Sequence, residues 1–197
     1  MNASWVIASH NQGKLGELRT LLGQRPVSLQ LAPALELPVP DETGSTFEDN
    51  AILKAVAAMN ATGLPALSDD SGVVVHALGG RPGIDTALWA GRERDFAIAR
   101  RRVQDELDAL GPNASRRTTW VTVLCLALPD GAVETFRGET HGALVWPTRP
   151  DTGAGFEPMF LPDGFAVTYA EMTPALRRRV NARAQAMRKL ERATFGT

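Results

Sequence analysis

Two adjacent aspartates, Asp69 and Asp70, lie between an apolar lead-in and a run of three valines in ALSDDSGVVV, residues 66 to 75. Strand interiors disfavour aspartate, and a buried carboxylate is costly unless a partner neutralises it. Either DDSG is a structural turn, or a cation meets the carboxylates. Asp41 and Glu42 form a second acidic pair in the loop LPVPDETGS. The two pairs together offer the oxygen ligands that Mg²⁺ prefers.

A polar stretch with one lysine, SHNQGK from Ser9 to Lys14, follows a predicted strand and precedes a predicted helix. Backbone N–H groups at a helix N-terminus, beside a hydroxyl, an amide and a lysine, suit a phosphate group. The P-loop spacing GxxxxGK[ST] is absent, so an ordinary turn with a surface lysine is the alternative. His10 within this stretch either contacts a phosphate or faces solvent.

Composition narrows the class of protein. The length of 197 residues predicts a single domain over 1–197, and 44% hydrophobic with 22% charged residues is typical of a soluble globular chain. A net charge of −1 gives no support to a nucleic-acid binder, although RRRVNARAQAMRKLER near the C-terminus is either a solvated helix face or a local anion site. The chain has no long apolar run and no basic leader at its start, and its single cysteine, Cys125, lies in an apolar strand, so we expect a cytoplasmic protein without membrane contact.

Hydrophobic spacing and turn signals predict a mixed α/β domain. Thr46 and Asp49 resemble a capping box, and Thr173 and Asn181 are typical helix N-caps. We expect helices at 14–23, 46–63 and 93–110 and two more after residue 173, strands at 4–9 and 27–33, a turn at 69–72, a hairpin of 118–128 with 132–146, and an irregular segment at 147–163.

The stretches SHNQGKLGEL, TFEDNAILKA, LPALSDDSGVVVHALGGRPGI, AGFEPMFLPDG and TYAEM, taken together, resemble the inosine triphosphate pyrophosphatase family, which hydrolyses aberrant purine nucleoside triphosphates. The resemblance runs from about residue 5 to residue 192, with the motifs in the same order. It implies an elongated mixed β-sheet with flanking helices, a central active-site cleft and a homodimer. It also implies Mg²⁺-dependent attack of water between the α and β phosphates, which releases a nucleoside monophosphate and pyrophosphate.

The resemblance also implies roles for particular residues. Asp70 matches the carboxylate regarded as general base and metal ligand, Ser71 follows it at the substrate, and Lys54 matches a lysine on the helix that we expect at 46–63. Asp41 or Glu42 falls where the family places its other metal ligand. The implied catalytic residues are Asp70, Lys14 and Lys54; the implied metal ligands are Asp41, Glu42, Asp69 and Asp70; the implied phosphate-binding residues are Ser9, His10, Asn11, Gln12, Gly13 and Lys14.

The base-recognition residues depart from the family pattern. The usual Phe-Gly-Tyr-Asp is here Ala154, Gly155, Phe156 and Glu157, so the ring that stacks on the purine is missing at Ala154. One such stack is worth about 1–3 kcal/mol. The usual Ser-His-Arg is Asn181, Ala182 and Arg183, Arg177 replaces a lysine, and Asp85 to Leu88 replace Tyr-Ser-Ala-Arg.

Three functional hypotheses follow. The first is a pyrophosphatase that acts on inosine, deoxyinosine or xanthosine triphosphate, and the second is a pyrophosphatase retuned to another base, with Asp85, Glu157 and Trp89 as base contacts or merely as surface and packing residues. The third is a nucleotide-binding protein with little turnover. Retention of Lys14, Lys54, Asp69 and Asp70 argues against the third, because a pure binder needs no carboxylate that activates water.

Overall fold

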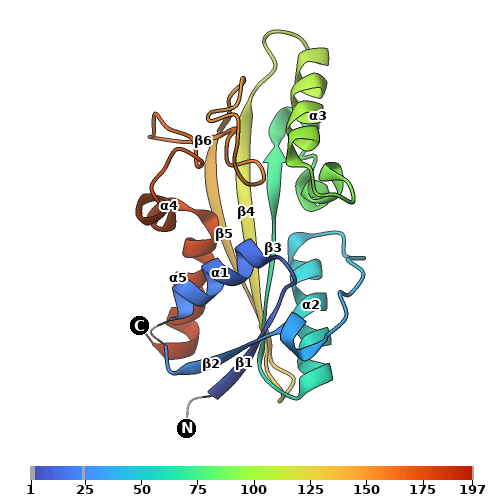
Figure 1. Ribbon diagram of the computed structural model, residues 1–197, viewed down its shortest axis with the longest axis vertical. Coiled ribbons are helices and arrows are strands. Elements are labelled where there is room, and N and C mark those ends of the chain that lie inside the picture. The colour runs from blue at the N-terminus through green and yellow to red at the C-terminus, as the bar shows by residue number, and fades with distance from the viewer. Residues whose placement is uncertain (1–2, 24, 197) are drawn as a thin grey trace. The chain divides into compact units, whose positions relative to one another are not determined.

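The computed structural model describes residues 3–23 and 25–196, and these form one mixed six-stranded sheet flanked by helices (Figure 1). The strand order is β2-β1-β3-β4-β5-β6, with β1 parallel to β2 and β3, and β5 antiparallel to β6. The strands are β1 (Ala3–Ala8), β2 (Val27–Leu31), β3 (Ala66–Val75), β4 (Arg117–Ala127), β5 (Val133–Leu144) and β6 (Phe160–Pro162). The helices are α1 (Gln12–Leu22), α2 (Phe47–Thr62), α3 (Phe96–Ala109), α4 (Pro174–Val180) and α5 (Ala182–Phe195), with 3-10 turns η1 (Ala32–Leu35), η2 (His76–Leu78), η3 (Gly83–Thr86) and η4 (Leu88–Ala90). The mixed α/β fold predicted from the sequence is confirmed.

Contacts divide the described chain into two compact units, whose boundaries fall inside β3, β4, β5 and α5. The first unit contains the described residues of 1–70, 122–137 and 186–197, and the second contains 71–121 and 138–185. A single domain, an elongated sheet and a central cleft stay predictions.

The core of the first unit lies on both faces of β1. Trp5 and Ile7 pack in one buried cluster with leucines of α1 and with Met187 of α5, whereas Val6 and Ala8 pack in another with Ala58 of α2. Successive strand residues point to opposite faces of a sheet. Helices α1 and α5 therefore cover one face of β1, and α2 covers the other.

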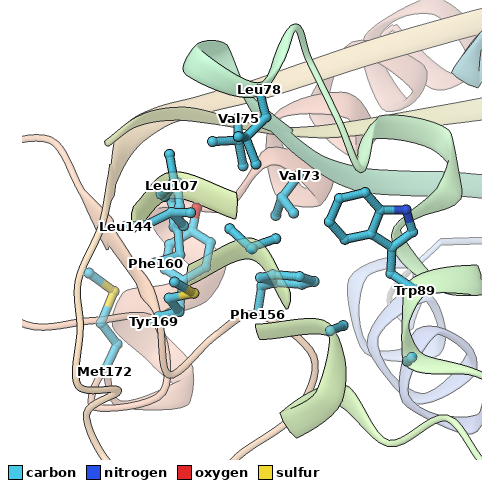
Figure 2. Close-up of a cluster of buried hydrophobic side chains, with 14 residues drawn as sticks. Val73, Val75, Leu78, Trp89, Leu107, Leu144, Phe156, Phe160, Tyr169 and Met172 are labelled. Atoms are coloured by element: carbon cyan, nitrogen blue, oxygen red, sulfur yellow. The ribbon is translucent and has the colours of Figure 1, made fainter. Parts of the chain in front are cut away.

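The core of the second unit gathers side chains from β3, α3, β5, β6 and the loops after β5 and β6 (Figure 2). The Phe160 ring lies 4.9 Å from that of Tyr169 and 5.5 Å from that of Trp120, in the tilted and edge-on arrangements that aromatic rings favour. Phe156, which follows β5 by twelve residues, is buried in the same cluster. The segment after β5 is thus anchored by apolar packing.

Local sequence signals placed most elements correctly. The Thr46 side chain accepts from the Asp49 N–H and the Asp49 carboxylate accepts from the Thr46 N–H, which confirms the capping box of α2. The N-caps Thr173 and Asn181 are also confirmed. Two predictions are wrong: residues 69–72 are not a turn but part of the continuous strand β3, and the segment 147–163 is not wholly irregular, because it contains β6. Within the described residues, each helix is too short or too polar to span a bilayer.

Candidate active site

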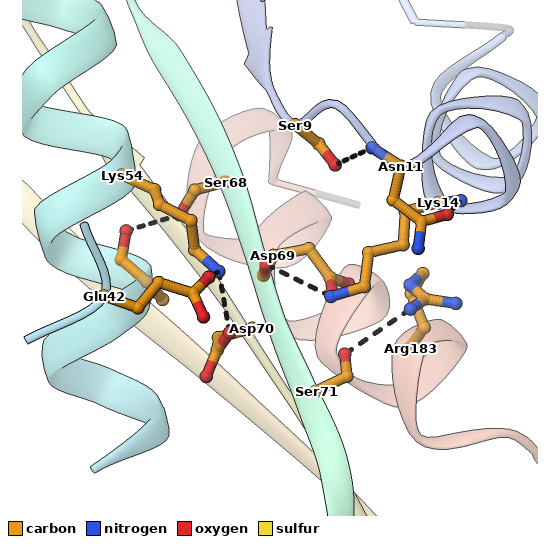
Figure 3. A network of polar contacts seen from close by, with 11 residues as sticks. Ser9, Asn11, Lys14, Glu42, Lys54, Ser68, Asp69, Asp70, Ser71 and Arg183 are labelled. Atoms are coloured by element: carbon orange, nitrogen blue, oxygen red, sulfur yellow. Dashed lines mark hydrogen bonds and ion pairs between the residues drawn. The ribbon is translucent and has the colours of Figure 1, made fainter. Parts of the chain in front are cut away.

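The two aspartates in β3 each meet a lysine from a different helix. Consecutive strand residues point to opposite faces, and Figure 3 shows the two lysines on opposite sides of the β3 ribbon. The fully buried Asp69 carboxylate lies 2.5 Å from Lys14 Nζ of α1. The Asp70 carboxylate lies 2.7 Å from Lys54 Nζ of α2. A strand can therefore hold both acidic side chains, because cations arrive from both faces.

Lys54 also joins Asp70 to Glu42. Its ammonium lies 2.7 Å from Glu42 Oε1, and the side chains of Lys54, Asp70 and Glu42 are 11%, 8% and 44% exposed. Burial raises the pKa of Asp70 against the opposing attraction of Lys54. Burial works to lower the pKa of Lys54, but Asp70 and then Glu42 outweigh it and raise that pKa. Lys54 therefore stays charged at neutral pH, and Asp70 is a stronger base than a surface aspartate.

The loop that carries Glu42 is fastened to the N-terminus of α2. The buried Asn50 side chain accepts a hydrogen bond from the Gly44 N–H at 2.9 Å. A Cβ on Gly44 would lie 2.5 Å from Asp49 Cβ, so only glycine fits this close approach. Asp41, one residue before Glu42, is exposed, and Glu42 is the member of the pair that reaches Lys54. The loop thus presents Glu42 rather than Asp41 to Asp70.

Asp70 and Glu42 fit a magnesium ion chemically. Asp70 Oδ2 is buried and has no hydrogen-bond partner among the described residues, which leaves one acceptor oxygen unused. Those residues contain no cluster of three or more His, Cys, Asp or Glu side chains that forms a metal cage. Mg²⁺ commonly binds through one or two carboxylates and takes its other ligands from phosphates and water. Asp69 is a less suitable ligand for the same ion than Asp70 or Glu42, because its side chain leaves β3 on the other face and pairs with Lys14.

The stretch SHNQGK forms the turn into α1, as the sequence predicts. Ser9 Oγ accepts from the Asn11 N–H, and Asn11 caps the helix by accepting from the Lys14 N–H, both at 3.2 Å. His10 is exposed and its Nε2 lies 2.9 Å from the Leu37 carbonyl oxygen, so the imidazole ties this turn to the segment after η1. The exposed Gln12 and Gly13 open the helix. Phosphate binding by these residues stays a prediction.

The second unit pairs most of the residues predicted to contact the base. Arg177 Nη1 donates to Glu157 Oε2 at 2.5 Å, and Arg183 Nη2 donates to Ser71 Oγ at 3.4 Å. The Gly155 carbonyl accepts from Arg100 Nη1 of α3 at 2.5 Å. The structure thus brings Glu157 to Arg177 and Ser71 to Arg183 within this unit.

Comparisons with known proteins identify the family of this chain. A family model described as the Ham1 family matches residues 5–193. The chain belongs to the Ham1 family. A dITP/XTP pyrophosphatase of Rhodospirillum centenum is 50% identical over 94% of this chain and 91% of its own length, and one of Brucella melitensis is 51% identical over 85% and 79%. The structure of a HAM1 protein from Coxiella burnetii, 31% identical, matches with a TM-score of 0.91 over 99% of this chain and 100% of that one.

Membership of the Ham1 family confirms the resemblance seen in the motifs. The residues that depart from the family pattern of base recognition lie in different environments in the structure. Ala154 is exposed. Phe156 and Ala182 are each 1% exposed, so their side chains pack in the interior and could meet a ligand only through backbone atoms. Trp89 is 9% exposed and its ring lies 3.7 Å from the Arg102 guanidinium carbon, which favours packing over base contact. Asp85 is exposed on η3.

Arg100 is the contact that sequence analysis of this Ham1 chain missed. We interpreted residues 93–110 as a charged amphipathic helix, in which an arginine belongs on the solvent face. Arg100 nevertheless shares the buried face of α3 with Ala99, Val103 and Leu107. Its position three residues before Val103 and seven before Leu107 was the available signal, because helical residues at that spacing share a face.

Proposed function

We propose that this Ham1 chain hydrolyses the noncanonical purine nucleoside triphosphates ITP, dITP and XTP to the monophosphate and pyrophosphate, with Mg²⁺ as cofactor. The observation that carries the proposal is the Asp70 carboxylate, which is buried beside Lys54 and keeps one oxygen without a hydrogen bond. The names of relatives that are about half identical to this chain support the same reaction class. The proposal extends to a homodimer, as the family resemblance implies, and to a cytoplasmic location, as we expect from the sequence.

Asp70 has the properties of a general base for water. Its burial raises its pKa, and the unpartnered Oδ2 is available to accept a proton from a water molecule that attacks the phosphate. Lys14 and Lys54 are the cations that we propose contact the triphosphate; in this structure each also pairs with an aspartate of β3. Glu42 and Asp70 would hold the magnesium ion, with the Asp70 oxygen that does not bind the ion acting as the base; the ion when bound polarises phosphate oxygens and lowers the pKa of its water.

Glu157 and Arg177 supply the chemistry for base selection. A keto purine such as hypoxanthine presents an N1–H donor beside an O6 acceptor, whereas adenine presents an acceptor beside an amino donor. A carboxylate accepts and a guanidinium donates, so the adjacent Glu157 and Arg177 match a keto purine when Glu157 faces N1–H and Arg177 faces O6, whereas the opposite order of the two groups would match adenine. The side chains of Arg177 and Glu157 are 31% and 23% exposed. We propose that Glu157 faces N1–H and Arg177 faces O6, the arrangement that the first of the three hypotheses requires.

The test is a turnover panel in Mg²⁺ that measures pyrophosphate and orthophosphate separately for ITP, dITP, XTP, dATP, dGTP and dCTP. We expect pyrophosphate from the first three. Asp70→Asn should lower kcat by about 10²–10⁴-fold, the usual contribution of a general base. Asp105→Asn is the matched control, because Asp105 is an aspartate on α3 whose side chain is 63% exposed. An undiminished rate in a folded Asp70→Asn variant, or release of orthophosphate alone, would refute the proposal.

A further inference from the structure

Arg100 is a buried cation in a helix whose other arginines face water. It is 6% exposed, whereas the Arg101 side chain is 65% exposed. A guanidinium carries five N–H donors and loses much hydration on burial, so it remains inside a protein only where it makes compensating contacts. Its Nη1 donates to the carbonyl oxygen of Gly155 at 2.5 Å, a charge-assisted hydrogen bond. Arg100 is therefore directed at one backbone atom of the loop after β5.

Helix α3 holds the next residue of that loop as well. Phe96, one turn before Arg100, meets Phe156 edge to face, with ring centroids 6.3 Å apart and an interplanar angle of 82°. Gly155 itself has a φ of +54°, a left-handed conformation that glycine adopts readily. Two consecutive residues are thus fixed by α3, one through its carbonyl and the other through its ring.

The third consecutive residue is Glu157, whose carboxylate pairs with Arg177 of α4. Its backbone is also held, because its carbonyl accepts from the Ala170 N–H at 3.2 Å. The direction of a side chain follows from the backbone that carries it, and Gly155 lies only two residues before Glu157. A shift of the Gly155 peptide would therefore move the Glu157 carboxylate relative to Arg177.

We propose that Arg100 is a positioning residue for base selection: it fixes the backbone of 155–157 so that Glu157 and Arg177 together face the edge of a keto purine. The inference rests on the proposed function and adds to it a residue outside the family motifs. Arg100 acts through Gly155 and does not touch the base. Its loss should weaken recognition of the base more than it slows hydrolysis, because the water-activating and phosphate-facing roles belong to Asp70, Lys14 and Lys54.

The experiment compares Arg100→Met, which keeps the length but removes charge and donors, with Arg100→Lys, which keeps the charge. Arg101→Met is the matched control on the exposed face of the same helix. For each protein we would measure kcat and KM for dITP and dATP, and the affinity for dIMP by calorimetry. We expect Arg100→Met to raise the KM for dITP and weaken dIMP binding by about tenfold or more, the effect of one lost recognition contact, with kcat within about threefold of the parent. Arg100→Lys should recover part of the loss, and Arg101→Met should match the parent.

Two results would overturn the inference. The first is a folded Arg100→Met protein in which the ratio of kcat/KM for dITP to kcat/KM for dATP equals that of the parent. Arg100 would then have no influence on base selection. An equal fall in kcat for both substrates, with dIMP affinity unchanged, means a structural role only. If Arg100→Met does not fold, the same criteria apply to Arg100→Lys.

The two proposals fail in different ways. A parent protein that binds dIMP but hydrolyses no triphosphate refutes the proposed function, while the dIMP affinities of the variants still decide the role of Arg100. A parent that neither binds dIMP nor prefers dITP refutes both, because Arg100 cannot then position a base site.

Discussion

Replacing Lys54 by methionine tests the central ion pair of the candidate site. Lys54 Nζ lies 2.7 Å from both Asp70 Oδ1 and Glu42 Oε1, and the Lys54 and Asp70 side chains are 11% and 8% exposed. Methionine keeps most of the aliphatic length, so the change removes the charge without opening a large cavity. The Asp70 carboxylate would then lose its nearest counter-charge while it remains buried.

The magnitude follows from the burial of each partner. Removal of one member of a buried ion pair costs about 3–5 kcal/mol, because the other charge is left uncompensated. The contact with the half-exposed Glu42 is a surface pair and adds at most about 1 kcal/mol. We therefore expect the free energy of unfolding of Lys54→Met to fall by about 3–5 kcal/mol at neutral pH, or roughly 6–20 °C in Tm for a chain of this length.

Urea denaturation in a buffer with a metal chelator would measure this loss for the parent, Lys54→Met, Asp70→Asn and the double variant. The double variant should be less destabilised than the sum of the single changes by more than about 1 kcal/mol, since the two side chains are in direct contact. Glu42→Gln is the control and should cost less than about 1 kcal/mol. A loss below 1 kcal/mol for Lys54→Met, with additive single effects, would refute the assignment of Lys54 and Asp70 as a buried, interacting pair.

Three further predictions concern other parts of the chain. Gly44→Ala should lower the free energy of unfolding by about 1–3 kcal/mol in urea, because its Cβ would lie 2.5 Å from Asp49 Cβ; unchanged stability would contradict the close approach. Burial raises the pKa of the Cys125 thiol to about 12, so at pH 8 the thiol stays protonated; iodoacetamide should label it only after unfolding in urea, and rapid labelling of the native protein would be inconsistent with its burial. Ala154→Phe should lower the KM for ITP by restoring a stacking ring at an exposed position, and no improvement would count against the missing ring as the cause of any weak binding.

The order of elements could be predicted because it depends on local signals. Apolar spacing marked α1 and α2, and the caps Thr46, Thr173 and Asn181 carried side chains whose partners lie three residues away. The family resemblance followed from motifs that are likewise contiguous, and both the fold class and the family are confirmed. The elements were predicted from neighbouring residues alone, and the family resemblance used short contiguous motifs together with their order along the chain.

The failures have a common cause, which is that the deciding partner is distant in the sequence. Aspartate is disfavoured in strands, so the local sequence predicted a turn at Asp69 and Asp70. The lysine that compensates the Asp69 charge, Lys14, is 55 residues away in the sequence and gave no local signal. The strand β6 comprises only Phe160–Pro162 and exists by pairing with β5. Arg100 likewise bonds a carbonyl 55 residues away. Apolar spacing can indicate that a residue is buried, but it does not identify a partner that lies far away in the sequence.

The two aspartates of β3 have different partners, because neighbouring side chains of a strand point to opposite faces of the sheet. Asp69 leaves the strand on the side of Lys14 and α1, where the pair ties the turn SHNQGK to the sheet. Asp70 leaves on the side of Lys54 and α2, where one of its oxygens is unpartnered and Glu42 lies across the same ammonium. Because neighbouring strand residues face opposite ways, one dipeptide connects two helices through two lysines. The two carboxylates thus have different surroundings: Asp69 pairs with the lysine of the predicted phosphate turn, whereas Asp70 pairs with Lys54 through Oδ1 and keeps Oδ2 without a hydrogen bond among the described residues; a metal site that uses both stays a prediction.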